Sequence, residues 1–298
     1  MHLPEAIQYF TDYLKYQKRY SSHTLRSYAD DLHQLNDYVV KEFGETQLNE
    51  LTSSIIRSWL ASMKDDDFAS RSINRKISAL KSFFKYHLRN GAITGTPMTQ
   101  VTSPKVPKRL PVFVKEEETS LLLEKVEFPD TMEGKTDRLI IELLYNTGLR
   151  SAELVSLKEG QVDASRKIIK VLGKGNKERI IPVSPALLAD IQQYINKKKT
   201  MDRAASTDRL LVTAAGKPVY AGYVYRTVKR YLELVTTIQK KSPHVLRHTF
   251  ATHLLSNGAD LNSVKELLGH ASLAATQVYT HHTIEKLREV HKKAHPKA

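Results

Sequence analysis

Three prolines crowd into one short stretch of the sequence, Thr102-Ser103-Pro104-Lys105-Val106-Pro107-Lys108-Arg109-Leu110-Pro111. Proline lacks an amide donor and restrains the residue before it, so this stretch should be extended and non-helical. A chain of 298 residues is also long enough for about two domains. We therefore expect a first domain at residues 1–100, a basic linker at 101–112 and a second domain at 113–298. A surface loop within one domain would also accommodate the prolines.

The first domain is predicted to be a helical unit, because its apolar residues recur at helical spacing. Ser22 and Ser70 are predicted N-caps of the second and fourth helices. The four apolar stripes are Ile7, Phe10 and Leu14; Leu25, Tyr28, Leu32, Leu35 and Val39; Ile55, Ile56, Trp59, Leu60 and Met63; and Ile73, Ile77, Leu80 and Phe84.

The second domain is predicted to contain a β-hairpin. Residues 167–172 and 179–183 are rich in Ile and Val, and the turn sequence Gly173-Lys174-Gly175-Asn176 lies between them. This pattern places Lys174 at the tip of the hairpin. The surrounding sequence is helical in pattern, so the expected fold class is mainly α with a small antiparallel β-sheet (α+β).

Glycines mark where several helices of the second domain should end. The apolar stripe Leu139, Ile140, Leu143 and Leu144 is expected to end at Gly148, and two later helices at Gly258 and Gly269. A short helix carrying Tyr279 should begin near Ser272. An amphipathic tail with Ile284, Leu287 and Val290 should follow.

The net charge of +14 makes a polyanion the first partner to consider, with solubility as the alternative explanation. The chain has no cysteine, which excludes disulfide and thiolate chemistry. Its first residues do not follow the pattern of a signal peptide, and no apolar run approaches the roughly 18 residues of a membrane span. We therefore expect a cytoplasmic protein without a membrane partner.

Six polar residues of the second domain would suffice to attack a phosphodiester without a metal ion: Arg150, Lys174, His244, Arg247, His270 and Tyr279. Two arginines can clamp the non-bridging oxygens and stabilise the pentacovalent state. A tyrosine phenol, with an ordinary pKa of about 10, needs cationic or basic help to act as a nucleophile. A lysine can protonate the leaving alkoxide, and histidines transfer protons near neutral pH.

Each of these residues is weak evidence by itself, but their order and context in combination are specific. The segments Leu144–Leu154, Val171–Arg179, His244–Leu255, Leu267–His270 and Val278–His281 closely resemble the tyrosine recombinases (phage integrase family). The similarity extends over the whole chain and is greatest to the bacterial XerC/XerD branch.

The resemblance implies a role for each matching position. Arg150 and Arg247 would activate the phosphate, and Lys174 would be the general acid of the hairpin. His244 would act as general acid/base, with His270 at the second histidine position. Tyr279 would be the nucleophile that forms a 3′-phosphotyrosyl link and frees a 5′-hydroxyl. Glu153 matches an acidic position that supports the active site from behind.

The resemblance also implies an architecture and partners. The first domain would be a SAM-like core-binding domain that forms a C-shaped clamp around double-stranded DNA with the catalytic domain. Recombination through a Holliday junction implies a tetramer of identical or homologous protomers on two DNA sites, with exchange of C-terminal helices. Phosphotyrosine conserves the bond energy, so no ATP, metal or other cofactor is expected. The branch implies resolution of chromosome dimers at cell division, with a septal DNA translocase as a partner left open.

Several basic residues outside the predicted active site are candidates for contacts with DNA phosphates. Solvated helix faces are the alternative explanation for these charges. The candidates are Arg71, Arg75, Lys76, Lys108, Arg109, Arg226, Lys229 and Arg230.

Other functions explain less of the sequence. A metal-dependent nuclease would have to use Asp65-Asp66-Asp67, which is predicted to be a solvated loop. A zinc site at His244 and His248 lacks the glutamate of H-E-x-x-H. A non-catalytic DNA-binding regulator would account for the charge but not for the six residues. A type IB topoisomerase would share the chemistry without two-partner exchange. A mobile-element integrase or DNA invertase of the same family remains the alternative to the Xer role.

Overall fold

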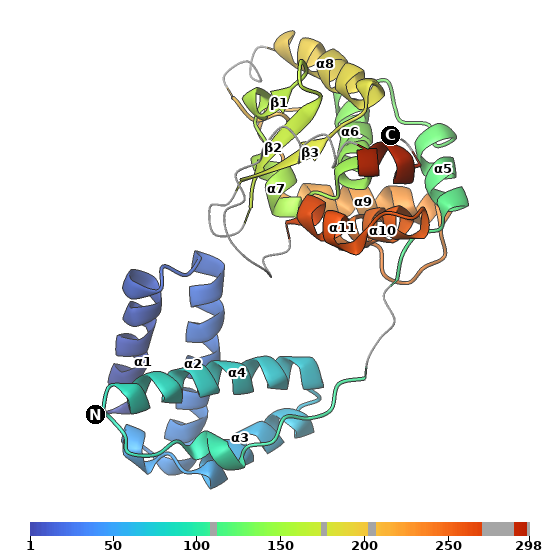
Figure 1. Ribbon diagram of the computed structural model, residues 1–298. Coiled ribbons are helices and arrows are strands. Elements are labelled where there is room, and N and C mark those ends of the chain that lie inside the picture. Colours follow the sequence, from blue (N-terminus) through green and yellow to red (C-terminus); the bar gives the residue numbers. More distant parts are fainter. Residues whose placement is uncertain (108–111, 174–177, 202–206, 270–288, 297–298) are drawn as a thin grey trace. The chain divides into compact units, whose positions relative to one another are not determined.

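The computed structural model describes residues 1–107, 112–173, 178–201, 207–269 and 289–296 (Figure 1). The chain forms two compact units, Met1–Arg109 and Leu110–Ala298, called here the N-terminal and C-terminal units. The division falls within the segment 101–112 that was expected to be a linker.

The N-terminal unit is helical throughout its described secondary structure. Its α-helices are α1 (Leu3–Asp12), α2 (Ser22–Phe43), α3 (Ser53–Asp65) and α4 (Ser70–Arg89), with short helical turns at Tyr13–Gln17, Leu48–Glu50 and Pro97–Gln100. The predicted caps are displaced by one residue: the Ser21 side chain caps α2, and Ala69 occupies the N-cap of α4. The predicted stripes supply much of the core, which packs around Phe10, Phe83 and Trp59.

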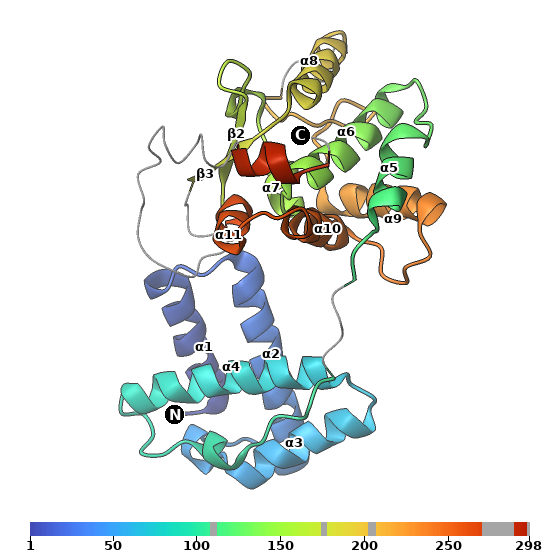
Figure 2. The same cartoon turned by 45° about the vertical axis from the view of Figure 1, so that its right-hand side comes forward.

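The C-terminal unit surrounds a small sheet with helices, so the fold is mainly α with an antiparallel sheet, as expected (Figure 2). Its helices are α5 (Glu116–Glu124), α6 (Met132–Thr147), α7 (Ser151–Ser156), α8 (Pro185–Lys199), α9 (Ala221–Val235), α10 (Pro243–Ser256) and α11 (Leu261–Leu268), with a 3₁₀ turn at Glu159–Gln161. The strands β1 (Val162–Asp163), β2 (Ile168–Leu172) and β3 (Glu178–Pro182) pair in that order. Leu172 pairs with Glu178, so β2 and β3 form the predicted hairpin.

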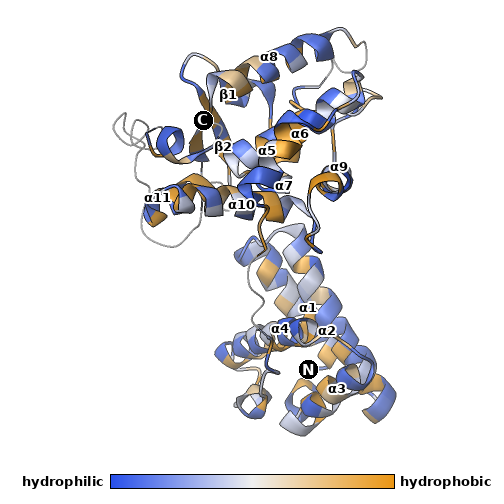
Figure 3. Cartoon of the chain, turned by 90° about the vertical axis from the view of Figure 1, so that its right-hand side faces the viewer, coloured by the Kyte–Doolittle hydropathy of each residue, from blue (hydrophilic) through white to orange (hydrophobic). Residues whose placement is uncertain are grey.

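Helix α6 is the centre of the C-terminal unit. Leu139, Ile140, Leu143 and Leu144 are almost completely buried, and Figure 3 shows an orange, hydrophobic stretch within α6. The helix contacts α8, α9 and α10. Because burial on several sides removes much apolar area from water, α6 is a fixed platform for the residues that follow its end.

The C-terminal segment 289–296 packs against its own unit. Residues 289–294 are helical and lie beside α6 and α10 (Figures 1 and 2). His291 Nε2 donates to the Asn146 carbonyl at 3.0 Å, and His295 Nε2 donates to the Tyr145 carbonyl at 3.2 Å. The last carbonyls of a helix lack intrahelical partners. The two histidines therefore cap the end of α6 with side chains from the far end of the chain.

Candidate active site

The turn after α6 positions Arg150. Gly148 ends the helix with φ of 60°, and a Cβ at this residue would lie 2.5 Å from the Phe250 ring, so both conformation and space require glycine. Arg150 follows as the N-cap of α7, where its amide donates to Glu153 Oε2 at 2.8 Å. The Arg150 side chain is 33% exposed. Its backbone is therefore held by Glu153 while its guanidinium reaches solvent.

Glu153 joins two arginines from different elements. Its Oε1 accepts from Arg150 Nη1 at 2.7 Å and from Arg179 Nη1 at 2.8 Å. Its Oε2 accepts from Arg179 Nη2, also at 2.8 Å. Burial alone would raise the pKa of this carboxyl, but the hydrogen bonds and charges of Arg179 and Arg150 lower its pKa to about 2. Glu153 is therefore ionised at neutral pH.

Helix α10 contributes the predicted pair His244 and Arg247. The two residues are three apart and share a face of the helix, with His244 exposed in the first turn and Arg247 buried. Arg247 donates through Nη1 to the Gly148 carbonyl and through Nη2 to the Leu268 carbonyl at 2.6 Å. Burial, followed by the charges of Arg150 and Arg179, lowers the pKa of Arg247 to about 10, and Glu153 opposes this.

Each of three arginines donates a hydrogen bond to a different carbonyl at the C-terminal end of α11. Arg179 Nε donates to Leu267 at 2.9 Å, Arg247 to Leu268, and Arg150 Nη2 to Gly269 at 3.2 Å. A helix C-terminus carries a partial negative charge, which attracts cations. The set Arg150, Arg179, Arg247 and Glu153, called here the arginine cluster, holds three guanidinium groups against one carboxylate. Its excess positive charge suits a bound phosphate.

Half of the six predicted residues lie outside the described residues: Lys174, His270 and Tyr279. The structure describes their neighbours. Glu178 and Leu172 close the base of the hairpin loop, and Gly269 precedes His270. Among the described residues, the structure brings Arg150 and Arg247 together at the end of α11, and Glu153 binds Arg150.

Comparison with known proteins shows the family to which this chain is similar. The model of the phage integrase family matches residues 113–286, and that of the phage integrase N-terminal SAM-like domain matches residues 7–91. Tyrosine recombinase XerC of Pelotomaculum thermopropionicum is 39% identical over 98% of each chain. XerC of Staphylococcus aureus strain MRSA252 is 38% identical over 100% of this chain and 97% of its own.

The chain belongs to the phage integrase family of tyrosine recombinases. Solved structures share its fold. The XerH recombinase bound to palindromic difH substrate has a TM-score of 0.70 and 23% identity, covering 95% of this chain and 83% of its own. The Tn1549 transposon integrase in complex with circular intermediate DNA has a TM-score of 0.69 and 20% identity, covering 94% and 98%.

The recombinase contains functional groups that the sequence interpretation missed, and Arg179 is the most important. The residue pairs with Val171 and lies two residues before the buried Ile181 on β3, so the alternation of the strand places both side chains on the inner face. That alternation is the signal that predicts a buried arginine here. Another missed residue is His253, whose Nε2 donates to the Val114 carbonyl at 2.9 Å and fixes the start of the C-terminal unit.

The basic residues expected to contact DNA differ in how far they are exposed to solvent. Lys76 does not fit: it is 1% exposed, and its ammonium binds Asp31 Oδ1 at 2.8 Å and Gln34 inside the N-terminal unit. Arg75 is half exposed and also binds Asp31. The exposed candidates are Arg71, Arg226, Lys229 and Arg230, whereas Lys108 and Arg109 lie outside the described residues.

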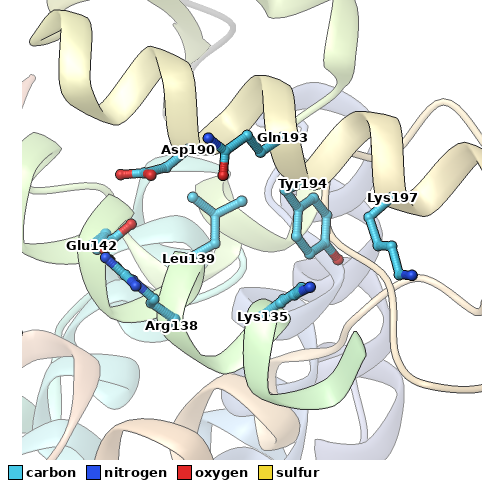
Figure 4. Close-up of a pocket in the computed structure, with 8 residues that line it drawn as sticks. All are labelled: Lys135, Arg138, Leu139, Glu142, Asp190, Gln193, Tyr194 and Lys197. Atoms are coloured by element: carbon cyan, nitrogen blue, oxygen red, sulfur yellow. Dashed lines mark hydrogen bonds and ion pairs between the residues drawn. The ribbon is translucent and has the colours of Figure 1, made fainter. Parts of the chain in front are cut away.

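A pocket between α6 and α8 is separate from the arginine cluster. Figure 4 shows that α6 supplies Lys135, Arg138, Leu139 and Glu142 and that α8 supplies Asp190, Gln193, Tyr194 and Lys197. Arg138 pairs with Glu142 at 2.8 Å, and burial raises the pKa of both Glu142 and Asp190. The charges of the acidic and basic side chains in this pocket therefore largely balance, whereas the arginine cluster has excess positive charge.

Two further findings concern possible metal sites and membrane spans in the described part of the chain. No group of three or more histidine, aspartate or glutamate side chains there is placed to hold a metal ion. Asp65 ends α3, and the two aspartates after it lie in an exposed turn. None of the described helices is both long and apolar enough to cross a membrane.

Proposed function

We propose that this recombinase cuts and rejoins double-stranded DNA at a specific site and resolves chromosome dimers at cell division in the manner of the Xer proteins. The arginine cluster is the observation that carries this proposal, because it offers excess buried positive charge where Arg150 remains open to solvent. The identity to XerC relatives over almost the whole chain supports the Xer role. The function places the protein in the cytoplasm.

Each catalytic residue has a step in this proposal. The Tyr279 hydroxyl oxygen attacks the phosphorus while Arg150 and Arg247 hold its non-bridging oxygens. The phenolic proton passes to a histidine base at 244 or 270, and the bond from phosphorus to the 5′ oxygen breaks. Lys174 protonates that oxygen, which leaves as a hydroxyl. Rejoining reverses these steps with the 5′-hydroxyl of the partner strand as nucleophile.

The proposed partners follow from the reaction. Strand exchange through a Holliday junction requires four protomers on two DNA sites, and the two units of each protomer would close on the duplex as a clamp. The segment 289–296 packs on its own unit here, and its exchange between protomers is part of the proposal. A septal DNA translocase would act as an activating partner.

The experiment captures the covalent intermediate. Purified protein is mixed with nicked, fragmented chromosomal DNA of the organism that encodes it, denatured with detergent and recovered with its attached fragments for sequencing. We expect enrichment of one site near the replication terminus. Enrichment at the ends of a mobile element would instead indicate an integrase, and enrichment at inverted repeats an invertase.

The matched control is Tyr279→Phe, which removes only the nucleophilic oxygen. It should abolish covalent attachment and leave DNA binding nearly intact, because one hydroxyl contributes little to a clamp built on many phosphate contacts. Binding is measured by gel shift, and attachment by survival of the complex in detergent. An adduct formed by this variant would refute the role of Tyr279.

A further inference from the structure

Arg179 is a buried cation with an unusually complete set of partners. The residue is 3% exposed and lies on β3, next to the Leu172–Glu178 pair that closes the loop of the β2–β3 hairpin. Both terminal nitrogens donate to Glu153 at 2.8 Å, and Nε donates to the Leu267 carbonyl. A buried guanidinium engaged on this many sides is committed to its protein partners and cannot turn to a phosphate outside.

The partner of Arg179 is shared with a residue of the active site. Arg179 takes both oxygens of Glu153, whereas the Arg150 guanidinium has a single hydrogen bond to Oε1. Two-pronged pairing is the preferred geometry between an arginine and a carboxylate. Without Arg179, Oε2 would keep only the hydrogen bond from the Arg150 backbone amide. Its free lone pair would then draw the Arg150 guanidinium into that pairing and away from solvent.

The end of α11 is shaped around the same side chain. Gly269 has φ of 64°, and a Cβ there would lie 2.9 Å from Arg179 Cδ. The adjacent Leu267 and Leu268 carbonyls bind Arg179 and Arg247. Arg179 therefore ties the hairpin, the α7 carboxylate and the α11 terminus to one point.

We propose that Arg179 is a positioning residue for DNA cleavage: it occupies Glu153 on both oxygens and so keeps the Arg150 guanidinium available to the scissile phosphate. This inference rests on the proposed function, since it assigns Arg150 to that phosphate. Arg179 itself does not touch DNA. By occupying both oxygens of Glu153, Arg179 prevents that carboxylate from drawing the Arg150 guanidinium away from the phosphate.

The kinetic test uses a nicked duplex that carries the site recovered by covalent capture. Single-turnover adduct formation and DNA affinity are measured for Arg179→Gln, Arg179→Lys and the control Lys170→Gln, which removes an exposed charge from the same sheet. We expect Arg179→Gln to slow adduct formation about 10- to 100-fold while affinity changes less than about twofold. Arg179→Lys should recover part of the rate, and Lys170→Gln should match wild type.

Two further readouts separate positioning from simple structural support. In Arg179→Gln, neutralising Glu153 should release Arg150, so the double variant Glu153→Gln/Arg179→Gln should cleave roughly tenfold faster than Arg179→Gln alone. For the same reason, the rate of Arg179→Gln relative to wild type should improve as the pH falls and Glu153 takes up a proton. Equal losses of affinity and rate, or a double variant no faster than Arg179→Gln, would overturn the proposal.

A measurement without DNA keeps this inference distinct from the proposed function. Carbon-13 labelling of glutamate carboxyls allows the pKa of Glu153 to be followed by NMR in wild type, Arg179→Gln and Arg179→Lys. We expect the pKa to rise strongly in Arg179→Gln and less in Arg179→Lys; an unchanged pKa would refute the pairing. Absence of an adduct with wild-type protein would speak against the proposed function instead, and leave this titration to decide the pairing.

Discussion

Each of the two units buries a cluster of charged side chains, and the two clusters differ in the groups that bind their cations. In the N-terminal unit, Lys76 and Asp31 are each about 2% exposed and meet at 2.8 Å, with Gln34 and the Trp59 ring as further neighbours of the ammonium. In the arginine cluster, three guanidinium groups share one carboxylate, and backbone carbonyls accept the remaining hydrogen bonds. A neutral carbonyl leaves positive charge uncompensated.

This difference separates a charge cluster that specifies a fold from one that is held ready for an anion. The buried pair of Lys76 and Asp31 balances its own charge, because Arg75, the second cation on Asp31, is half exposed to water. Removing Lys76 leaves a buried carboxylate with only that exposed partner. A cationic cluster that is held by dipoles keeps its geometry before the substrate arrives, which lowers the reorganisation needed in the transition state. Substitutions in the two clusters should therefore affect different measurements.

Arg247→Gln should produce the largest effect. Glutamine retains amide donors but has no charge to offer the phosphate, so adduct formation should fall about 10²- to 10³-fold, equivalent to about 3–4 kcal/mol. DNA affinity should fall far less, because many other phosphate contacts remain. Single-turnover cleavage and gel shift on the captured site measure the two quantities. Near-wild-type cleavage would show that the cluster does not hold the scissile phosphate.

Lys76→Met should lower the stability of the N-terminal unit by about 3 kcal/mol, because Asp31 loses its buried partner and keeps only the half-exposed Arg75. The chain has one tryptophan. It is Trp59, buried in this unit, so its fluorescence during urea unfolding reports on the correct region. The rate of cleavage per folded molecule should be unchanged.

The control for Lys76→Met is the double variant Asp31→Leu/Lys76→Met, which removes both charges and should recover much of the stability. If Lys76→Met instead weakens DNA binding without loss of stability, the lysine contacts DNA after all and the contrast between the clusters fails.

The sequence predicted the elements that depend on local pattern. The end of α6 at Gly148 follows from a helical stripe followed by glycine, and the hairpin follows from two apolar runs around a turn. Arg150 and Arg247 could be placed together only through resemblance to a family, since they lie on different helices. The burial of Lys76 could have been read from its position three residues after Ile73 on the apolar side of α4.

Partners distant in sequence could not be predicted. Lys76 and Asp31 are 45 residues apart, and Arg179 and Glu153 are 26 apart. No periodicity within one element reports which side chain of another element will face it. For the same reason, the sequence did not predict that His291 and His295 cap the end of α6.

Those histidines lead to the smallest predicted effect, a pH dependence that should differ between the units. Burial, with the charge of His291, lowers the pKa of His295 to about 3, and burial also lowers the pKa of His291 and His253. An unfolded histidine has a pKa of about 6.5. The folded state therefore binds fewer protons, and its stability is complete above pH 6.5 and is lost progressively as the pH falls toward 3.

Between pH 7.5 and 5.5, protonation of the unfolded state at His295 should cost about 1 kcal/mol of stability, and the other buried histidines should act in the same direction. Among the described residues, the N-terminal unit has one buried histidine with a lowered pKa, His87, and the C-terminal unit has three. The C-terminal unit should thus lose more stability as the pH falls. Its unfolding is followed by far-UV circular dichroism, after subtracting the transition of the N-terminal unit that Trp59 fluorescence reports. His295→Gln, which keeps a donor for the Tyr145 carbonyl, should flatten its pH slope. An unchanged slope would mean that His295 has the same pKa in the folded and unfolded states, so that the cap on α6 tolerates a protonated ring.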